Sequence, residues 1–238
     1  MVDVRRAAER FTTRGDGITT RHSFSFGAFY DPANVSHSAL VAHNDEELAP
    51  RRGYHLHPHA DVEIVTWVLE GSLVHEDSEG RSGLVRPGVV QLLGAGRGVR
   101  HSERNDGPAP DGSAAPVRFV QMWLRPDESG LDPSYARHDV GGDLAADTLV
   151  PLVSGIAAVD AGVPIRVRGA ALHVARLSSG GAVEVPDAPH LHVFVTRGRV
   201  DLEGAGPLEP GDAARFTADG ARRLSGLSPA EVLVWQLP

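Results

Sequence analysis

The sequence predicts an all-β protein made of two tandem β-barrels. No long run shows the 3.6-residue periodicity of an amphipathic helix. Short runs rich in β-branched residues alternate with Gly, Pro and Asp instead, which is typical of sandwiches and barrels. The two halves also repeat one order of strands and turns, which favours two copies of a single barrel unit.

Eight runs are the candidate strands, because each is rich in strand-forming residues and bounded by turn residues. They are 37–44, 63–77, 89–94, 117–124, 171–177, 191–202, 213–217 and 232–237. The polar, Pro- and Gly-rich stretch at 105–116 predicts an exposed loop. Residues 125–150 lack sustained periodicity and predict a connector.

The internal repeat is anchored by turns. Gly71 in the first half pairs with Gly198 in the second, and Pro87-Gly88 pairs with Pro210-Gly211. In both halves a strand, a Gly turn, a second strand, a Pro-Gly turn and a third strand follow in that order. A duplicated barrel unit explains this order although few residues are identical.

Composition narrows the classes of function. Hydrophobic residues make up 41% and charged residues 23% of the 238 residues, as in an ordinary globular protein. The net charge of −8, with basic residues scattered along the chain, argues against nucleic acid as a partner. The chain has no cysteine, which excludes disulfides, thiolate metal sites and cysteine nucleophiles.

Neither a signal peptide nor a membrane span is expected. The first ten residues, MVDVRRAAER, become charged at once. No stretch reaches the roughly 18–20 apolar residues that a spanning helix needs. We therefore expect a cytoplasmic protein.

The stretch GYHLHPHADVE (53–63) concentrates potential metal ligands. His55, His57, His59, Asp61 and Glu63 occupy alternate positions. In a regular strand these five side chains would leave the same face. The sequence alone therefore raises the question of which of them do chemistry.

Two pairs of potential ligands share a strand face, one in this run and one further along the chain. His57 and His59 are two residues apart, as are His101 and Glu103 further along the chain. If neighbouring strands carry the pairs, three imidazoles and a carboxylate converge, a set that suits a divalent transition metal. A single His most often has no function beyond its place at the surface or in the core. Burying two pairs of polar side chains inside a barrel without a binding partner, however, would cost free energy. Pro58 predicts an edge or bulged strand position.

These residues resemble the two cupin signatures. The first is His57-x-His59-x3-Glu63 followed by Gly71, and the second is Pro87-Gly88 followed by His101-x3-Asn105. More narrowly, HPHADVEIVTWVLEGSLVHEDSEG and RPGVVQLLGAGRGVRHSE resemble the pirin family. RHSFSFGAFYDP and HND are similar to its bacterial, quercetinase-type branch. The resemblance covers most of residues 4–135, and the second half matches in layout only.

The resemblance implies a bicupin with one metal, held in the first barrel by His57, His59, His101 and Glu103. It implies a metal-binding cupin domain at 1–130, a connector at 131–150 and a degenerate, metal-free cupin domain at 151–238. Fe(II) is the expected native metal, with Ni, Cu, Mn or Zn as alternatives in purified protein.

The other polar residues of the first run are expected not to bind metal. Counted from Gly71, His55 falls two residues before the signature positions, and we expect it and Asp61 at the surface. Glu63 is a ligand in many cupins but usually not in pirins. Ala60 stands where many pirins have a basic residue, which leaves the pocket rim and the substrate preference open.

The second half contains His190-Leu191-His192, which also invites a metal interpretation. Aligning Gly198 with Gly71 places Glu184 and Pro186 opposite the first ligand pair, and Leu224 opposite His101. Because several ligands are replaced at once, we predict no metal there.

The resemblance and the ligand set imply an oxidoreductase similar to quercetin 2,3-dioxygenase, which opens a flavonol ring with O2 and releases CO. Glu103 is the ligand that could accept the flavonol proton as general base. A non-enzymatic, metal-bearing and redox-responsive regulator that binds a protein partner is the alternative. A cupin isomerase is a weaker third interpretation.

Overall fold

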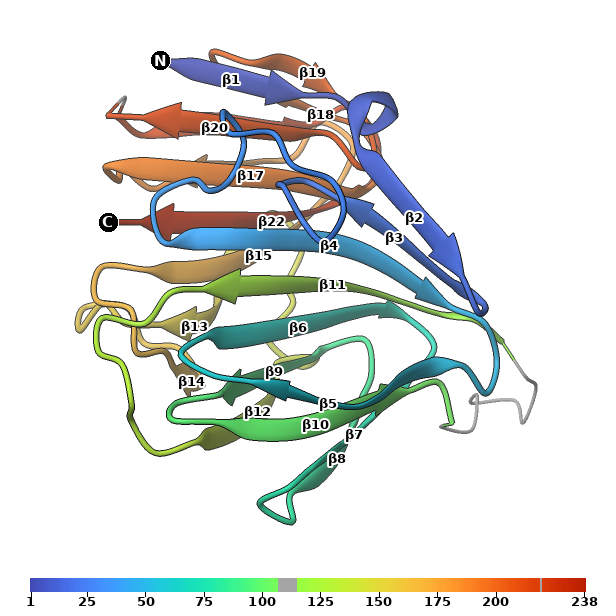
Figure 1. The fold of residues 1–238 in the computed structure, drawn as a ribbon. Helices are drawn as coiled ribbons and strands as arrows, with labels where there is room; N and C mark the ends of the chain where they lie inside the picture. Colours follow the sequence, from blue (N-terminus) through green and yellow to red (C-terminus); the bar gives the residue numbers. More distant parts are fainter. Residues whose placement is uncertain (107–114, 219) are drawn as a thin grey trace. The chain divides into compact units, whose positions relative to one another are not determined.

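A computed structural model describes residues 1–106, 115–218 and 220–238, so most of the predicted loop at 105–116 lies outside the described residues. The described chain forms antiparallel β-sheets and one 3-10 turn, Ala7–Glu9 (Figure 1). One short parallel pair, β13 with β14, is the exception. Two compact units are present, an N-terminal barrel unit (11–36 and 40–141) and a C-terminal barrel unit (1–10, 37–39 and 142–238).

The N-terminal barrel unit contains a seven-stranded and a four-stranded sheet. The larger sheet has the order β12-β9-β6-β11-β4-β3-β2, and the smaller has the order β5-β10-β7-β8. Its strands are β2 (Phe11–Gly15), β3 (Ile18–His22), β4 (Leu40–Leu48), β5 (Gly53–His59), β6 (Glu63–Glu70), β7 (Leu73–Asp77), β8 (Ser82–Val85), β9 (Val89–Gly94), β10 (Val99–Arg104), β11 (Val117–Leu124) and β12 (Ser134–Asp139).

The C-terminal barrel unit repeats this arrangement. Its sheets have the orders β1-β20-β17-β22-β15-β13-β14 and β16-β21-β18-β19. Its strands are β1 (Val2–Arg5), β13 (Thr148–Ser154), β14 (Val163–Pro164), β15 (Ala171–Leu177), β16 (Ala182–Val185), β17 (His190–Arg197), β18 (Val200–Leu202), β19 (Gly206–Leu208), β20 (Ala213–Thr217), β21 (Arg222–Gly226) and β22 (Ala230–Leu237). The predicted all-β fold with two cupin-type units is confirmed.

The anchors of the predicted repeat occupy equivalent turns. Gly71 and Gly198 have φ of 73° and 70°, and Gly88 and Gly211 have φ of 91° and 87°. A Cβ at Gly71 would also lie 2.8 Å from the carbonyl oxygen of Pro116. A side chain would therefore be strained there by backbone conformation and by close approach.

Four predicted strands, 89–94, 117–124, 171–177 and 213–217, have the predicted bounds. The run 63–77 divides at Gly71 into β6 and β7, and 191–202 divides at Gly198 in the same way. The run 37–44 is displaced, because β4 starts at Leu40. Residues 134–139, expected in a connector, form β12 and pair with β9. The division at 1–130, 131–150 and 151–238 stays a prediction.

The inner face of the N-terminal barrel unit changes character along its strands. On β4, Leu48 packs in an apolar cluster, whereas Asn44 and Glu46, on the same face, line a cavity. On β11, Phe119 belongs to that cluster and Gln121 lines the cavity. Burial of the apolar cluster stabilises the barrel by about 25 cal/mol per Å² of apolar surface. The polar side chains of the same face line the cavity instead.

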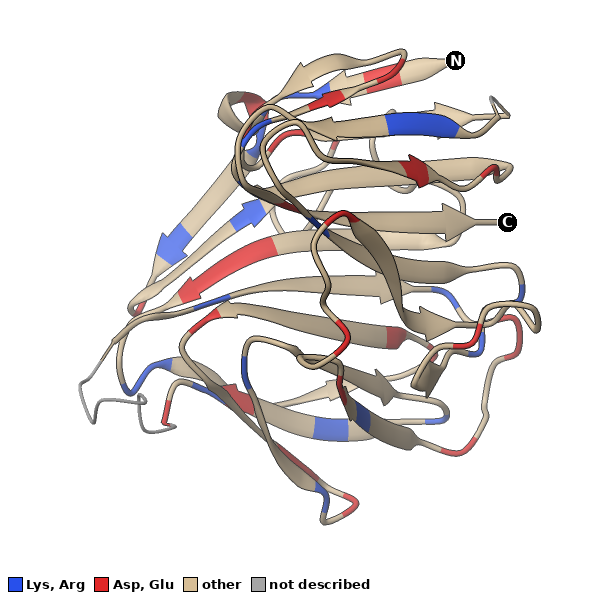
Figure 2. Ribbon diagram, turned by 180° about the vertical axis from the view of Figure 1, so that it is seen from behind, with Lys and Arg blue, Asp and Glu red and all other residues tan. Residues whose placement is uncertain are grey.

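Charged residues of both signs are interspersed rather than gathered into a basic stripe (Figure 2). Among the described residues, no helix is long and apolar enough to cross a membrane.

Candidate metal centre

The two predicted ligand pairs lie on neighbouring strands. β5 and β10 pair antiparallel, with His57 directly opposite His101 and His59 opposite Val99. β5 is an edge strand of its sheet. Pro58 therefore occupies an edge position, as its missing N–H predicted.

A β-bulge explains why His55 does not join the other two histidines. The register shifts so that Glu103 lies opposite Tyr54, while His101 lies opposite His57. The extra residue on β5 breaks the strict alternation that the sequence suggested. His55 is exposed, and its carbonyl oxygen lies 2.7 Å from Nδ1 of His57. If that Nδ1 donates its proton to the carbonyl, Nε2 of His57 is the nitrogen whose lone pair can bind a metal.

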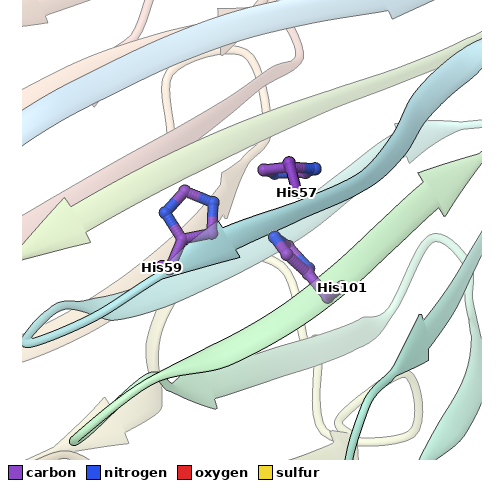
Figure 3. A group of neighbouring side chains, drawn as sticks. All are labelled: His57, His59 and His101. Atoms are coloured by element: carbon purple, nitrogen blue, oxygen red, sulfur yellow. The ribbon is translucent and has the colours of Figure 1, made fainter.

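The three imidazoles converge. The ring centroids of His57, His59 and His101 lie 4.5 to 5.0 Å apart. One ring nitrogen of each lies within 4.8 Å of the others. Figure 3 shows the three rings gathered at β5 and β10.

Glu103 joins the group through His101, since an oxygen of Glu103, a nitrogen of His101 and a nitrogen of His75 lie within 4.8 Å of one another. Glu103 is 1% exposed. Gln121 Nε2 donates a hydrogen bond of 2.8 Å to its Oε2. One carboxylate oxygen is thus held in place by β11.

The remaining polar atoms of this group fit a metal ion. Nε2 of His59, Nε2 of His101 and Oε1 of Glu103 are buried and have no hydrogen-bond partner among the described residues. A buried polar atom without a partner costs roughly 1–3 kcal/mol. Three such atoms in one cluster, all of types that bind divalent transition metals, could be satisfied together by one ion.

The surroundings of His59 and His101 lower the pKa of both imidazoles. Burial, followed by the neighbouring His57, lowers the pKa of His59 to about 4. Burial and the three nearby histidines lower the pKa of His101 to about 2. Neutral imidazole is the form that binds metal. Burial raises the pKa of Glu103 to about 7, against the opposing hydrogen bond from Gln121.

The other residues singled out from the sequence lie apart from this cluster. Asp61 is exposed and accepts a hydrogen bond of 2.7 Å from the backbone N–H of Gly130. Glu63 is buried on β6. In the C-terminal barrel unit, Nδ1 of His190 lies 2.7 Å from the carbonyl oxygen of Pro238, and His192 is buried on β17.

The sequence alignment of the two halves is one residue out of register at the first ligand pair. Val183 lies opposite Leu224 in the C-terminal barrel unit, just as His57 lies opposite His101. The counterparts of His57 and His59 are therefore Val183 and Val185, not Glu184 and Pro186. The loops before the Gly turns cause the shift, because three residues (60–62) separate β5 from β6, whereas four (186–189) separate β16 from β17. Val185 and Leu224 belong to an apolar core cluster.

A cavity of about 350 Å³ adjoins the candidate ligands, and His57, His59 and Glu103 line it. Phe26 and Trp123 form an aromatic wall, with an edge-to-face contact at 5.2 Å between ring centroids. Cavities of about 300–1,000 Å³ are typical of small-molecule sites.

Another part of the cavity wall is polar and was not predicted from the sequence. Asn44 and Glu46 of β4 line the cavity beside Thr20 and Tyr54. The Tyr54 hydroxyl donates to Oε2 of Glu46 and lies 3.2 Å from the Thr20 hydroxyl. Burial raises the pKa of Glu46 to about 8; the Tyr54 hydrogen bond opposes this shift and Glu103 adds to it. The cavity thus contains a second carboxyl group that is largely protonated at neutral pH.

This raised pKa predicts a pH-dependent stability. The folded state holds the Glu46 proton more tightly than the unfolded chain, whose Glu has a pKa near 4.5. Its contribution is therefore full below about pH 4.5, falls as the pH rises, and is lost above about pH 8. Urea unfolding of metal-free protein should show Glu46→Gln losing less stability than wild type over this range, by on the order of a few kcal/mol. Glu47→Gln, a change at a partly exposed neighbour, is the control and should follow wild type. Parallel pH profiles for Glu46→Gln and wild type would refute the shift.

The fold and the residue cluster define a two-barrel cupin protein with a candidate metal centre in one barrel. The sequence model described as Pirin matches residues 3–124. The chain belongs to the pirin family.

Relatives and solved structures agree with this assignment. A Mycobacterium tuberculosis protein named "Putative quercetin 2,3-dioxygenase" is 47% identical over 236 residues, covering 99% of this chain and 95% of the relative. Escherichia coli quercetin 2,3-dioxygenase is 38% identical over 135 residues, covering 57% of this chain and 56% of the relative. The crystal structure of the bacterial pirin YhhW of Escherichia coli in complex with nickel(II) superposes with a TM-score of 0.89 and 29% identity, covering 100% of this chain and 99% of that one.

Proposed function

We propose that this pirin is a metal-dependent dioxygenase of quercetinase type, which opens the ring of a flavonol such as quercetin with O2 and releases CO. The observation that carries the proposal is Oε1 of Glu103, which has no partner among the described residues and lies on an aromatic-walled cavity beside His101, one of the three converging imidazoles. The names of the relatives support the same reaction class.

The proposed ligands are His57, His59, His101 and Glu103, with Fe(II) as the native metal. Imidazole and carboxylate suit iron, and nickel, copper, manganese or zinc could replace it according to availability. When bound, the metal would supply Lewis acidity toward a phenolic oxygen and the electronic coupling needed for reaction with O2.

Glu103 is the proposed general base. A carboxylate held beside the metal can accept the flavonol proton and later return it. The Gln121 amide donates to Oε2 and leaves Oε1 to face the proposed metal and the flavonol 3-hydroxyl beside it.

The cavity wall would orient a flat, hydroxylated aromatic substrate. Phe26 and Trp123 offer aromatic surfaces on which such a ring can pack. Glu46 and Tyr54 offer hydrogen-bonding groups to the hydroxyls of a second ring. A polyphenol uses both walls, whereas an aliphatic substrate would gain no aromatic packing.

The test is a quercetin assay run with and without O2, with CO measured. We expect loss of quercetin absorbance and release of about one CO per quercetin from metal-loaded protein in air, and neither in anaerobic or metal-free samples. Oxygen-independent loss of quercetin, or full turnover without metal, would refute the proposal. Metal binding without any flavonol turnover would favour the regulatory alternative.

A further inference from the structure

Two buried polar side chains lie behind the candidate ligands on the next strand. β7 pairs with β10 on the side away from β5, with Asp77 opposite His101 and His75 opposite Glu103. The His75 and Asp77 side chains are both 0% exposed. Neither residue is one of the four ligands proposed above.

These side chains form a line that ends at His101. Nδ1 of His75 lies 3.4 Å from Nδ1 of His101. On the other side of the ring, Nε2 of His75 lies 3.6 Å from Oδ2 of Asp77. Asp77, His75 and His101 therefore follow one another, each with a polar atom turned toward the next.

Other contacts hold the middle of the line, His75, and its far end, Asp77. The Tyr135 ring stacks on His75, with centroids 4.9 Å apart and an interplanar angle of 19°. Oδ1 of Asp77 accepts backbone N–H hydrogen bonds from Glu79 at 2.9 Å and Arg81 at 3.0 Å. The imidazole is thus fixed in plane, and the carboxylate is fixed by a turn of the backbone.

The proton positions along this line follow from one requirement. If Nε2 of His101 faces the metal, then Nδ1 of His101 carries the proton and donates it toward Nδ1 of His75. His75 must then accept at Nδ1 and carry its own proton on Nε2, where the carboxylate of Asp77 faces it. The tautomer of His101 thus fixes that of His75, and the Asp77 carboxylate at the far end of the line faces the N–H of His75.

We propose that His75 and Asp77 are positioning residues that hold His101 in the ring orientation and tautomer that present Nε2 to the metal. Ligand histidines in metal sites commonly donate their second N–H in this way, and loss of the acceptor typically weakens metal binding 10- to 100-fold. The inference rests on the proposed metal centre but not on flavonol turnover.

One competing arrangement makes His75 itself a ligand, since a nitrogen of His75 lies within 4.8 Å of the ligand atoms of His101 and Glu103. The two arrangements predict different consequences of replacing His75. A positioning residue can be exchanged for another acceptor without changing the number of ligands. A ligand cannot, and its loss alters the coordination of the metal.

The experiment titrates metal-free protein with Co(II) against a competing chelator and records the visible absorption of the bound ion. We expect His75→Leu to bind Co(II) about 10- to 100-fold more weakly than wild type, with a d–d spectrum of the same intensity class. His75→Gln, whose side-chain oxygen can accept from Nδ1 of His101, should recover most of the affinity. Glu76→Gln, an exposed neighbour on β7, should match wild type.

A double-mutant cycle tests the line as a unit and uses a milder change. Asp77→Asn keeps Oδ1 for the turn and should weaken Co(II) binding in the wild-type background but have little further effect in His75→Leu. Unaltered affinity in His75→Leu and Asp77→Asn, or additive losses in the cycle, would overturn the inference. Loss of the Co(II) spectrum, or its change to that of a site with fewer ligands in His75→Gln, would also overturn it and make His75 a ligand. Absence of Co(II) binding by folded wild-type protein would instead count against the metal centre itself.

Discussion

Glu103→Gln should reduce flavonol turnover per bound metal by about 10²- to 10⁴-fold, the usual contribution of a general base. The amide has the shape of the carboxylate, so the hydrogen bond from Gln121 can be kept. It cannot, however, accept the 3-hydroxyl proton. The measurement is the steady-state rate of quercetin loss divided by the metal content of the same sample.

The control for this prediction is Ser102→Ala, which changes the residue beside Glu103 on β10 while leaving the proposed ligands intact. It should retain wild-type turnover. If Glu103→Gln kept more than about one tenth of the wild-type rate per metal, Glu103 would not be the base, and the proton would have to leave by another route.

The double variant His57→Ala, His59→Ala should bind no metal at micromolar concentrations. It removes two of the three imidazoles whose ring nitrogens converge within 4.8 Å. Glu103 and one imidazole from β10 would remain, too few protein ligands for tight binding of a divalent ion. Elemental analysis of purified, dialysed protein measures the effect directly.

His55→Ala is the matched control, because it removes an exposed imidazole from the same strand. It should keep one metal per chain and wild-type turnover. Metal retained by the double variant, in particular a full equivalent, would locate the principal site elsewhere and would contradict the prediction of a metal-free C-terminal barrel unit.

The sequence predicts the fold well where strands are apolar and bounded by turns. The run 117–124 is such a case, and β11 has the same bounds. Short or polar strands are harder to predict, because their side chains show little of the alternation between apolar and polar residues that marks a strand. β12 (Ser134–Asp139) is polar and partly exposed. It is stabilised by pairing with β9, not by the strand preference of its own residues.

The candidate site was predicted in part. The His57/His59 and His101/Glu103 pairs are visible as side chains two residues apart, and strand pairing brings them together. The bulge that turns His55 away depends on a register shift between two strands, which no local pattern encodes. The alternation of His57 and His59 was informative only because the bulge lies before them.

The supporting residues were missed for a different reason. Gln121 and Glu46 lie on the larger sheet and their partners Glu103 and Tyr54 on the smaller one, so only the closed barrel brings the side chains together. His75 and Asp77 did carry a signal, since they are again two residues apart on one strand. That spacing acquires meaning only once β7 is known to pair with β10.

Stepwise metal reconstitution tests the central claim most directly. Metal-free protein is titrated anaerobically with Fe(II), and the initial rate of quercetin loss in air is measured at each addition. The account predicts a rate that starts near zero, rises linearly and stops rising at one Fe(II) per chain. A full rate in the metal-free protein, or a rise that continues to two Fe(II) per chain, would contradict it.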